Sequence, residues 1–265
     1  MSPANPGYLL DNQQSEAGDR FQVMARMFNP GTFRRLEAVG ITGGWRCWEV
    51  GAGSAGVPRW MAERVGSGGA VLATDIDLAY LGADDGFEVR RHDVAAEPAP
   101  GRDFDLVHAR AVLTHVPGRD RALASMVAAL RPGGWLVLED VDPGMQPLSC
   151  PDEYAPEHRR ANRLRKGFRT LLTARGADVA YGRTIPRRLR AAGLVDVEAE
   201  AYLPLSSPDC ARLEDATIRL IRDDLIAAGL ATATEIDDHL RYVATDPGQF
   251  ATSAMITAWG RKPLE

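Results

Sequence analysis

The chain has 265 residues, of which 45% are hydrophobic, and its formal net charge is −5 at pH 7. This size predicts one globular domain with an insertion or a cap, and the acidic balance argues against a general nucleic-acid surface, which is normally basic. No apolar run approaches the ~18 residues of a membrane span. The residues near the N-terminus include acids and lack the basic and apolar blocks of a signal peptide. We therefore expect a cytoplasmic protein.

The three cysteines, Cys47, Cys150 and Cys210, lie far apart in the sequence. Their odd number and wide spacing fit reduced thiols, and neither a disulfide framework nor a metal site. The histidines and carboxylates also lack the spacing of metal ligands, so we expect no bound metal. A magnesium site among acids at one edge of the sheet is the weaker alternative. Cys47 falls within a predicted strand and is expected in the core.

Two amphipathic helices are predicted ahead of the first strand. The first spans residues 16–28 and ends at Asn29-Pro30-Gly31, and the second begins at Thr32 as its cap and stops at Gly40. Together they could form a lid over a ligand. Residues 8–12 could close over the same ligand, although a simple packing arm is the favoured interpretation.

The stretch from Trp45 to Gly56 predicts a strand, a tight loop and a helix. A short apolar run meets glycines at Gly51, Gly53 and Gly56, and an amphipathic segment follows over residues 58–65. Glycine suits such a loop because it adopts positive φ and lets the main chain approach a ligand closely. The unpaired N–H groups of the helix point at whatever lies above the loop. The spacing alone equally fits a nicotinamide or flavin dinucleotide site.

Beyond this loop, strands and helices alternate, which predicts a parallel sheet with helices on both faces. Because ligands bind at the carboxyl ends of such strands, polar residues that follow the strands are expected at one edge. A carboxylate at Asp75 suits the two hydroxyls of a ribose, and a solvated helix-capping acid is the alternative. The strands are expected at residues 70–74, 87–91, 104–107 and 135–138, with a helix at 119–130 closed by 131–134, and the polar residues at their ends are Asp75, Asp93, His108 and Glu139.

The second half of the chain mixes both kinds of element. Helices are predicted at 157–175, 185–192, 209–228 and 234–243, and strands at 194–203 and 250–260. The helix at 157–175 is rich in cations, for which a solvated face is the favoured interpretation and contact of one or two with an anionic substrate or partner is the alternative. These cations are Arg159, Arg160, Arg163, Arg165, Lys166, Arg169 and Arg175.

Five segments, taken in order, resemble the class I S-adenosylmethionine-dependent methyltransferases that act on small molecules. The resemblance is firm over residues 45–141 and continues through 182–197. A looser likeness, at residues 8–11 and 28–30, is to an actinobacterial group of such enzymes. The five segments are Glu49-Val50-Gly51-Ala52-Gly53, Thr74-Asp75-Ile76-Asp77, His92-Asp93-Val94, Phe104-Asp105-Leu106-Val107 and Leu130-Arg131-Pro132-Gly133-Gly134.

The resemblance implies a fold and a division of the chain. The fold is α/β, with a Rossmann-like, seven-stranded, mostly parallel sheet, helices on both faces, and an antiparallel last strand. A helical cap comes from the N-terminus and from a C-terminal insertion. The single domain divides into a helical lid (1–44), a cofactor-binding core (45–142) and the remaining sheet with cap insertions (143–265).

The resemblance also implies S-adenosyl-L-methionine as cofactor, S-adenosyl-L-homocysteine as product, and roles for site residues. The glycine loop would hold the methionine part, Asp75 the ribose, Ile76 and Asp93 the adenine, and His108 or Ala109 would lie under the sulfonium. His108 is the first candidate for a base and Arg110 for orienting the acceptor, whereas His115 fits a packed turn. The full cofactor-binding set is Glu49, Gly51, Ala52, Gly53, Asp75, Ile76, Asp93, Val94, His108 and Ala109.

The expected reaction is methyl transfer to an O, N or C nucleophile of a small molecule, with secondary metabolism as the suggested setting. No nucleic acid or membrane is expected as a partner, and a homodimer is left open. Two alternatives remain: a protein of the same fold that binds the cofactor without methylating, and an NAD(P)-dependent oxidoreductase. The late glycine loop and the lack of a Tyr-x-x-x-Lys pair disfavour the oxidoreductase.

Overall fold

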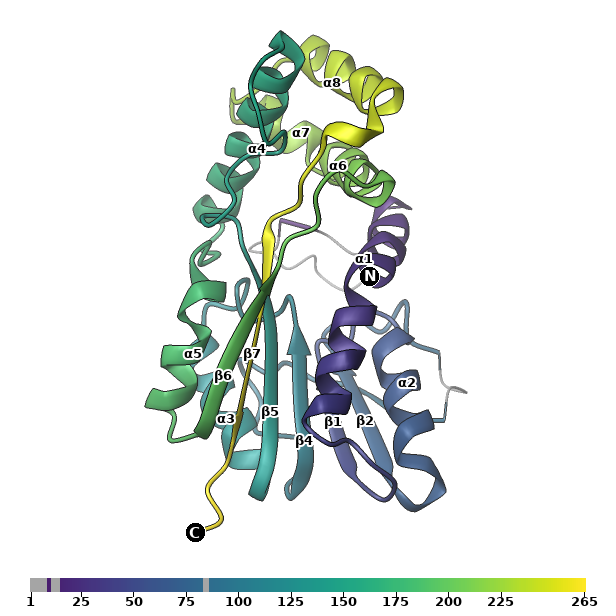
Figure 1. Cartoon of the computed structure of the whole chain (residues 1–265), viewed down its shortest axis with the longest axis vertical. Helices are drawn as coiled ribbons and strands as arrows, with labels where there is room; N and C mark the ends of the chain where they lie inside the picture. The colour runs from purple at the N-terminus through teal and green to yellow at the C-terminus, as the bar shows by residue number, and fades with distance from the viewer. Residues whose placement is uncertain (1–8, 11–14, 83–85) are drawn as a thin grey trace. The chain divides into compact units, whose positions relative to one another are not determined.

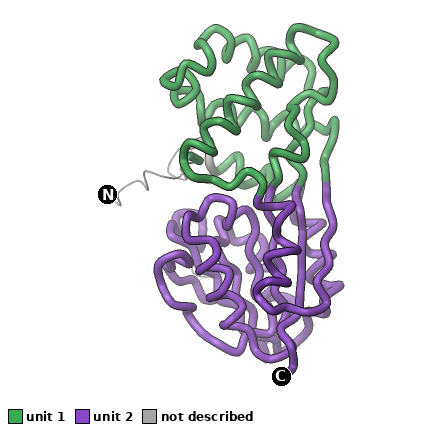
Figure 2. The backbone as a smooth tube through the Cα atoms, turned by 90° about the vertical axis from the view of Figure 1, so that its left-hand side faces the viewer, with its two compact units in different colours: residues 1–27, 142–180, 203–254 green, residues 28–141, 181–202, 255–265 purple. Residues whose placement is uncertain are grey.

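The computed structural model describes residues 9–10, 15–82 and 86–265. The chain divides into two compact units, which Figure 2 shows in different colours. Unit 1 comprises residues 1–27, 142–180 and 203–254, and unit 2 comprises residues 28–141, 181–202 and 255–265. The division into lid, core and cap stays a prediction.

Figure 1 shows the sheet, which belongs to unit 2 except for the strand-end residues Asp142 and Ala254. The described residues form seven strands in the order β3-β2-β1-β4-β5-β7-β6. Strands β1 to β5 pair in parallel with one another, whereas β6 and β7 pair antiparallel. The predicted fold class, including the antiparallel last strand, is confirmed. The strands are β1 (Arg46–Val50), β2 (Ala70–Asp75), β3 (Glu88–Arg91), β4 (Phe104–Arg110), β5 (Leu130–Asp142), β6 (Val195–Tyr202) and β7 (Ala254–Arg261).

Hydrophobic layers cover both faces of the sheet. On one face, α3 and α5 contribute buried side chains such as Leu123 and Ile185. On the other, α2 and the last part of α1 contribute Met61 and Leu36, and Cys47 is fully buried among them, as predicted. The helices are α1 (Ser15–Ala38), α2 (Gly56–Val65), α3 (Arg119–Ala129), α4 (Pro156–Ala174), α5 (Tyr181–Ala191), α6 (Pro208–Leu220), α7 (Arg222–Ala227) and α8 (Ala233–Thr245).

Unit 1 is helical. Helices α4, α6, α7 and α8 share a core that includes Leu164 and Ile236, and Leu9 and Leu10 are buried in the same core. These two leucines therefore behave as the packing arm predicts, while residues 8, 11 and 12 of the predicted arm lie outside the described residues. No helix in the described part of the chain combines the length and the apolar character needed to cross a membrane.

Arg159, Arg163 and Lys166 of α4 are exposed, in line with the predicted solvated face, whereas Arg165 is buried and paired within unit 1. Arg165 is only 8% exposed. Its guanidinium donates to Glu214 at 2.9 Å and to the carbonyl of Ala251 at 3.1 Å. Nε2 of the buried His239 lies 3.1 Å from the other carboxylate oxygen of Glu214. Helical spacing places Arg165 on the helix but does not reveal that a carboxylate 49 residues later faces it.

Helix α1 is continuous, whereas the sequence predicts two helices separated at 29–31. Pro30 lies inside α1, although proline lacks an N–H donor and its ring crowds the preceding turn. The side chains that flank Pro30 are held from the sheet: Arg110 donates to Asn29 at 2.8 Å and to Thr32 at 2.9 Å. These tertiary hydrogen bonds support the helix across the proline. The stop predicted at Gly40 is confirmed, since this glycine follows α1 with a φ of 95°.

Strand β5 begins earlier than predicted, because residues 131–134 belong to it and do not simply end α3. The register with β4 jumps from the pair Phe104 and Leu130 to the pair Leu106 and Trp135. Residues 131–134 therefore form an irregular bulge. Gly134 lies at its end, where an added Cβ would meet the carbonyl oxygen of Phe104 at 2.7 Å.

We expect the substitution Gly134→Ala to destabilise the protein by about 1–3 kcal/mol, the usual cost of overpacking against atoms that cannot move aside. The measurement is the free energy of unfolding in urea. Gly31→Ala is the matched control, because a Cβ at Gly31 meets nothing within 4 Å in helix α1; alanine in a helix should be neutral or stabilising there. Equal free energies for both variants would contradict the close packing of Gly134.

Candidate functional site

The glycine loop follows β1 at the edge where the parallel strands end, which we call the carboxyl edge of the sheet. Gly51 and Gly53 have φ values of 62° and 60°, a region that other residues rarely adopt. A Cβ on Gly51 would lie 2.4 Å from Cγ2 of Val112, and one on Gly56 would lie 3.2 Å from the side-chain nitrogen of Asn29. Protein therefore crowds this loop on two sides, from the chain after β4 and from α1.

Asp75 ends β2 beside the glycine loop and is 7% exposed. Its carboxylate accepts hydrogen bonds from the backbone N–H groups of Gly53 at 2.8 Å and Asp77 at 3.1 Å. Burial raises the pKa of this carboxyl, against the opposing effect of these N–H donors. The side chain is thus fixed in orientation, and an oxygen with remaining lone pairs can accept from a ligand hydroxyl.

The predicted adenine contacts lie after β2 and β3. Ile76 is 43% exposed, so its side chain has an apolar face available for a ring to pack on. Asp93 accepts from the N–H of Ala95 at 2.8 Å and is half-buried. Val94 and Ala109 are buried in the hydrophobic layer that α3 and α5 cover, so only their main chains are available to a ligand.

His108 joins the ends of three neighbouring strands. Its Nδ1 lies 2.6 Å from the carboxylate of Glu49 on β1, and its Nε2 lies 3.3 Å from that of Glu139 on β5. All three side chains are buried, at 0%, 2% and 3% exposure for His108, Glu49 and Glu139. Strand register produces this arrangement, because Glu49 is paired directly with His108 and neighbouring strand residues point to the same face.

The charges of this cluster stabilise one another. Burial lowers the pKa of His108, but Glu49 and Glu139 outweigh that effect and raise it to about 9. Burial raises the pKa of Glu139, but hydrogen bonding and attraction from His108, with help from Arg110 and Thr32, bring it down to about 2. The cluster therefore holds an imidazolium between two carboxylates at neutral pH.

Hydroxyl groups and an arginine complete the cluster. Thr257 of β7 donates to one oxygen of Glu139 at 2.7 Å, and Thr32 of α1 donates to the other. Arg110 in turn donates to Thr32 and Asn29. Sequence reasoning missed Asn29, Thr32 and Thr257 as members of this cluster. Thr32 and Thr257 are separated from Glu139 by 107 and 118 residues, so no local pattern signals the contacts.

This geometry does not suit His108 to the role of a base, because both ring nitrogens already face carboxylates and neither has a free lone pair. The geometry instead suits a positioning role for His108, in which it holds Glu49, the glycine loop that follows Glu49, and α1 in place. Arg110 lies beside this cluster, and its hydrogen bonds to Thr32 and Asn29 of α1 fix the orientation of its guanidinium. Within the described residues, no group of three or more His, Cys, Asp or Glu side chains is arranged to hold a metal ion.

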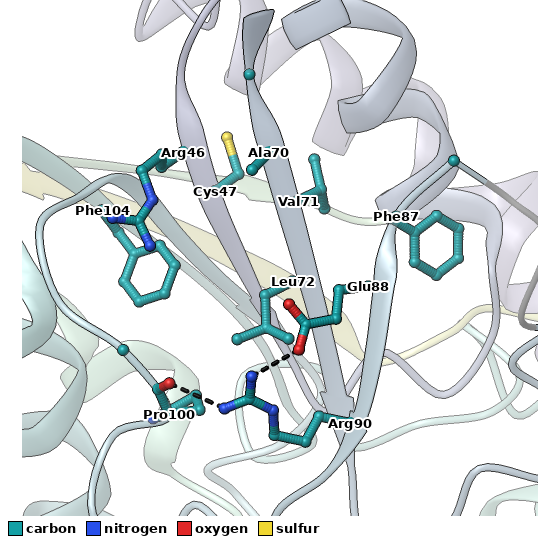
Figure 3. A pocket seen from close by; sticks show the side chains of 13 residues that line it. Arg46, Cys47, Ala70, Val71, Leu72, Phe87, Glu88, Arg90, Pro100 and Phe104 are labelled. Atoms are coloured by element: carbon teal, nitrogen blue, oxygen red, sulfur yellow. Dashed lines mark hydrogen bonds and ion pairs between the residues drawn. The ribbon is translucent and has the colours of Figure 1, made fainter. Parts of the chain in front are cut away.

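A cavity of about 540 Å³ lies elsewhere, at the amino ends of the strands (Figure 3). Arg46 and Phe104 at the starts of β1 and β4 line it, with Glu88 and Arg90 of β3. The guanidinium of Arg90 is occupied by Glu88 at 2.6 Å and by the carbonyl of Pro100 at 3.0 Å. None of the predicted site residues lines this cavity. It is therefore separate from the carboxyl edge of the sheet.

Comparison with known proteins bears on the segment that carries these residues. Residues 48–138 match a protein family described as a methyltransferase domain. The ubiquinone/menaquinone biosynthesis C-methyltransferase UbiE of Vibrio parahaemolyticus is 30% identical over 146 residues, which cover 49% of this chain and 56% of that protein. The protein of the same name from Laribacter hongkongensis is 28% identical over 165 residues, covering 54% of this chain and 68% of that protein. The chain thus spans little more than half of the first relative.

Among solved structures, phosphoethanolamine N-methyltransferase 2 of Haemonchus contortus, in complex with S-adenosyl-L-methionine, has a similar fold, with a TM-score of 0.58. Sequence identity is 15%, and the match covers 97% of this chain and 60% of that one. At this identity the likeness speaks for the fold alone. The family match confirms the resemblance found in the sequence over residues 48–138, which match a methyltransferase domain, and the solved structure shows that the fold is shared.

Proposed function

We propose that the protein transfers a methyl group from S-adenosyl-L-methionine to a small-molecule acceptor. The observation that carries this proposal is the coincidence of the family match at 48–138 with the segment from β1 to β5. That segment contains the glycine loop, Asp75, Ile76 and Asp93 at one edge of the sheet. The relatives named above are methyltransferases by name, which supports the same reaction class for this chain.

The residues at the carboxyl edge fit the proposed cofactor. Positive φ at Gly51 and Gly53 opens main chain to the amino-acid part of a ligand. The fixed carboxylate of Asp75 can accept from the ribose hydroxyls, and the exposed side chain of Ile76 can pack on the adenine ring. Asp93 is proposed to accept from the adenine amine. The proposed binding set is completed by Glu49, Ala52, Val94, His108 and Ala109. The buried members of this set contribute through their main chains or by supporting neighbouring residues.

When bound, the cofactor supplies a sulfonium methyl, a strong electrophile for a nucleophile held in line with it, so positioning alone supplies much of the rate. The chain's own part is to hold that geometry. We assign His108 to positioning, since it fixes Glu49 and Glu139 at the ends of β1 and β5. Arg110, held by α1, is proposed to orient the acceptor. Secondary metabolism stays a prediction.

Calorimetric titration of the purified chain with S-adenosyl-L-methionine, S-adenosyl-L-homocysteine and NAD, run in parallel, tests the proposal. Micromolar binding of the first two and none of NAD is expected. Binding of NAD alone would overturn it in favour of an oxidoreductase. Binding of the first two by a protein that methylates no acceptor in a broad small-molecule panel would favour a protein that uses the cofactor without methyl transfer.

Asp75→Asn should weaken binding of S-adenosyl-L-homocysteine at least tenfold, about 1.4 kcal/mol, because an amide replaces a carboxylate that accepts from hydroxyls. The matched control is Asp77→Asn, which removes a neighbouring carboxylate whose side chain accepts from the N–H of Ala79. Calorimetry on both variants and the parent measures the difference. If the two variants bind equally well, Asp75 does not hold the ribose.

The His108 cluster should make stability fall as pH rises. The pKa of His108 is raised in the folded protein from 6.5 to about 9, so its contribution is fully present below pH 6.5 and is lost as pH approaches 9. Thermal midpoints of the parent and of His108→Gln, measured from pH 6 to 10, should converge toward alkaline pH. His92→Gln is the control, since that buried ring faces the carbonyl of Pro98 in place of a carboxylate. A constant gap between parent and His108→Gln would contradict an imidazolium at this position.

A further inference from the structure

Asp140 follows Glu139 on β5 and points to the opposite face of the sheet, as successive strand residues do. It is 2% exposed. Its carboxylate accepts from the N–H of Thr114 at 2.9 Å and from that of Val141 at 3.2 Å. Among the described residues, no cation forms an ion pair with it. Glu139 has His108 and two hydroxyls as partners, so the two adjacent carboxylates have contrasting surroundings.

The partner of Asp140, Thr114, belongs to residues 111–117, which we call the post-β4 segment. The segment starts with Ala111 at a φ of 57°, a conformation that alanine rarely adopts. The N–H of Ala111 donates to the carbonyl of Glu139 at 2.8 Å. Strand β5 therefore holds the segment at two points, the carbonyl of Glu139 and the side chain of Asp140.

The post-β4 segment is packed against the glycine loop. Between the two points held by β5 lies Val112, whose Cγ2 occupies the space in which a Cβ of Gly51 would lie. A turn closed by the bond from the N–H of His115 to the carbonyl of Val112, at 3.0 Å, fixes this valine within the segment. Displacement of the segment would therefore displace the support of the glycine loop.

An ionised Asp140 is costly for folding. Burial raises its pKa to about 6, although the N–H groups of Thr114 and Val141 oppose that effect. A buried charge without a counter-charge commonly makes a protein less stable than a neutral residue of the same shape would. A group retained at such a cost is often one that function requires.

We propose that Asp140 is a positioning residue that holds the post-β4 segment against the glycine loop, so that cofactor binding requires its ionised form. The inference rests on the proposed function. Protonation or an amide turns one of the two oxygens into a hydrogen-bond donor or replaces it by one, so an N–H group at this carboxyl loses its charged acceptor. The affinity for the cofactor should therefore fall as pH drops through the pKa of Asp140.

Other polar groups pack around Asp140 and do not replace this contact. Tyr181 of α5 lies on the same face, and its buried hydroxyl has no hydrogen-bond partner in the part of the chain that the structure describes. Arg119, at the start of α3, donates to the carbonyls of Leu113 and Thr114. Arg188 of α5 pairs with Asp120 of α3 at 2.6 Å. Glu139 and its partners occupy the opposite face.

The test is calorimetric binding of S-adenosyl-L-homocysteine to the parent, Asp140→Asn and Asp105→Asn between pH 5 and 8. The parent should lose affinity about fivefold over this range, as a charged hydrogen bond becomes a neutral one. Asp140→Asn should bind weakly at pH 8, about as the parent does at pH 5, with an unchanged or higher thermal midpoint. Asp105→Asn makes the same change at the amino end of β4, where Asp105 pairs with Arg131, and should bind as the parent does.

Asp75, whose pKa is also raised, is present in all three proteins, so its share of the pH dependence cancels in the comparison. Equal affinity of Asp140→Asn and the parent at pH 8 would overturn the inference while leaving the proposed function standing. A parent that binds no S-adenosyl-L-homocysteine at any pH would instead refute the proposed function. If Asp140→Asn does not fold, the pH dependence of binding by the parent tests the inference instead. A parent affinity for S-adenosyl-L-homocysteine that does not change from pH 8 to 5 also overturns the inference.

Discussion

The imidazolium of His108 between Glu49 and Glu139 is the interaction on which the carboxyl edge of the sheet depends. Two buried carboxylates on the strands that flank β4 would repel each other and cost several kcal/mol each to desolvate. The ring removes both problems and ties β1, β4 and β5 together at the point where each strand ends. The glycine loop starts two residues after Glu49, and α1 is bound to the same cluster through Thr32. The glycine loop and the helix beside it therefore share one electrostatic anchor.

Two adjacent acids on β5 show how strand geometry separates roles. Glu139 and Asp140 point to opposite faces, so one meets His108 and the other meets the N–H of Thr114. Their pKa values diverge to about 2 and about 6 for that reason. Environments that push a pair of titratable groups apart in this way are frequent at functional sites. One acid is fixed as a charge, and the other can respond to pH in the physiological range.

The sequence predicted most elements because strands and helices leave local patterns: the glycine loop, the strand-helix alternation and the polar strand ends all depend on neighbouring residues. Helix α1 shows where this fails, because Pro30 argues for a break and only the distant Arg110 supports continuity. The base role predicted for His108 had the same weakness. The sequence predicted that His108 lies at the end of a strand. The two carboxylates that face its ring nitrogens, however, come from strands 59 and 31 residues away.

Residues 48–138 match a family described as a methyltransferase domain, and the relative from Vibrio parahaemolyticus is a C-methyltransferase by name. Unit 1 lies outside that segment and holds the cations that would suit an anionic acceptor. Three of those cations form ion pairs within the unit: Arg163 pairs with Glu235, Arg165 with Glu214 and Arg175 with Asp224. Breaking the buried pair of Arg165 would leave an uncompensated charge. These three arginines are therefore engaged by carboxylates within the helical unit.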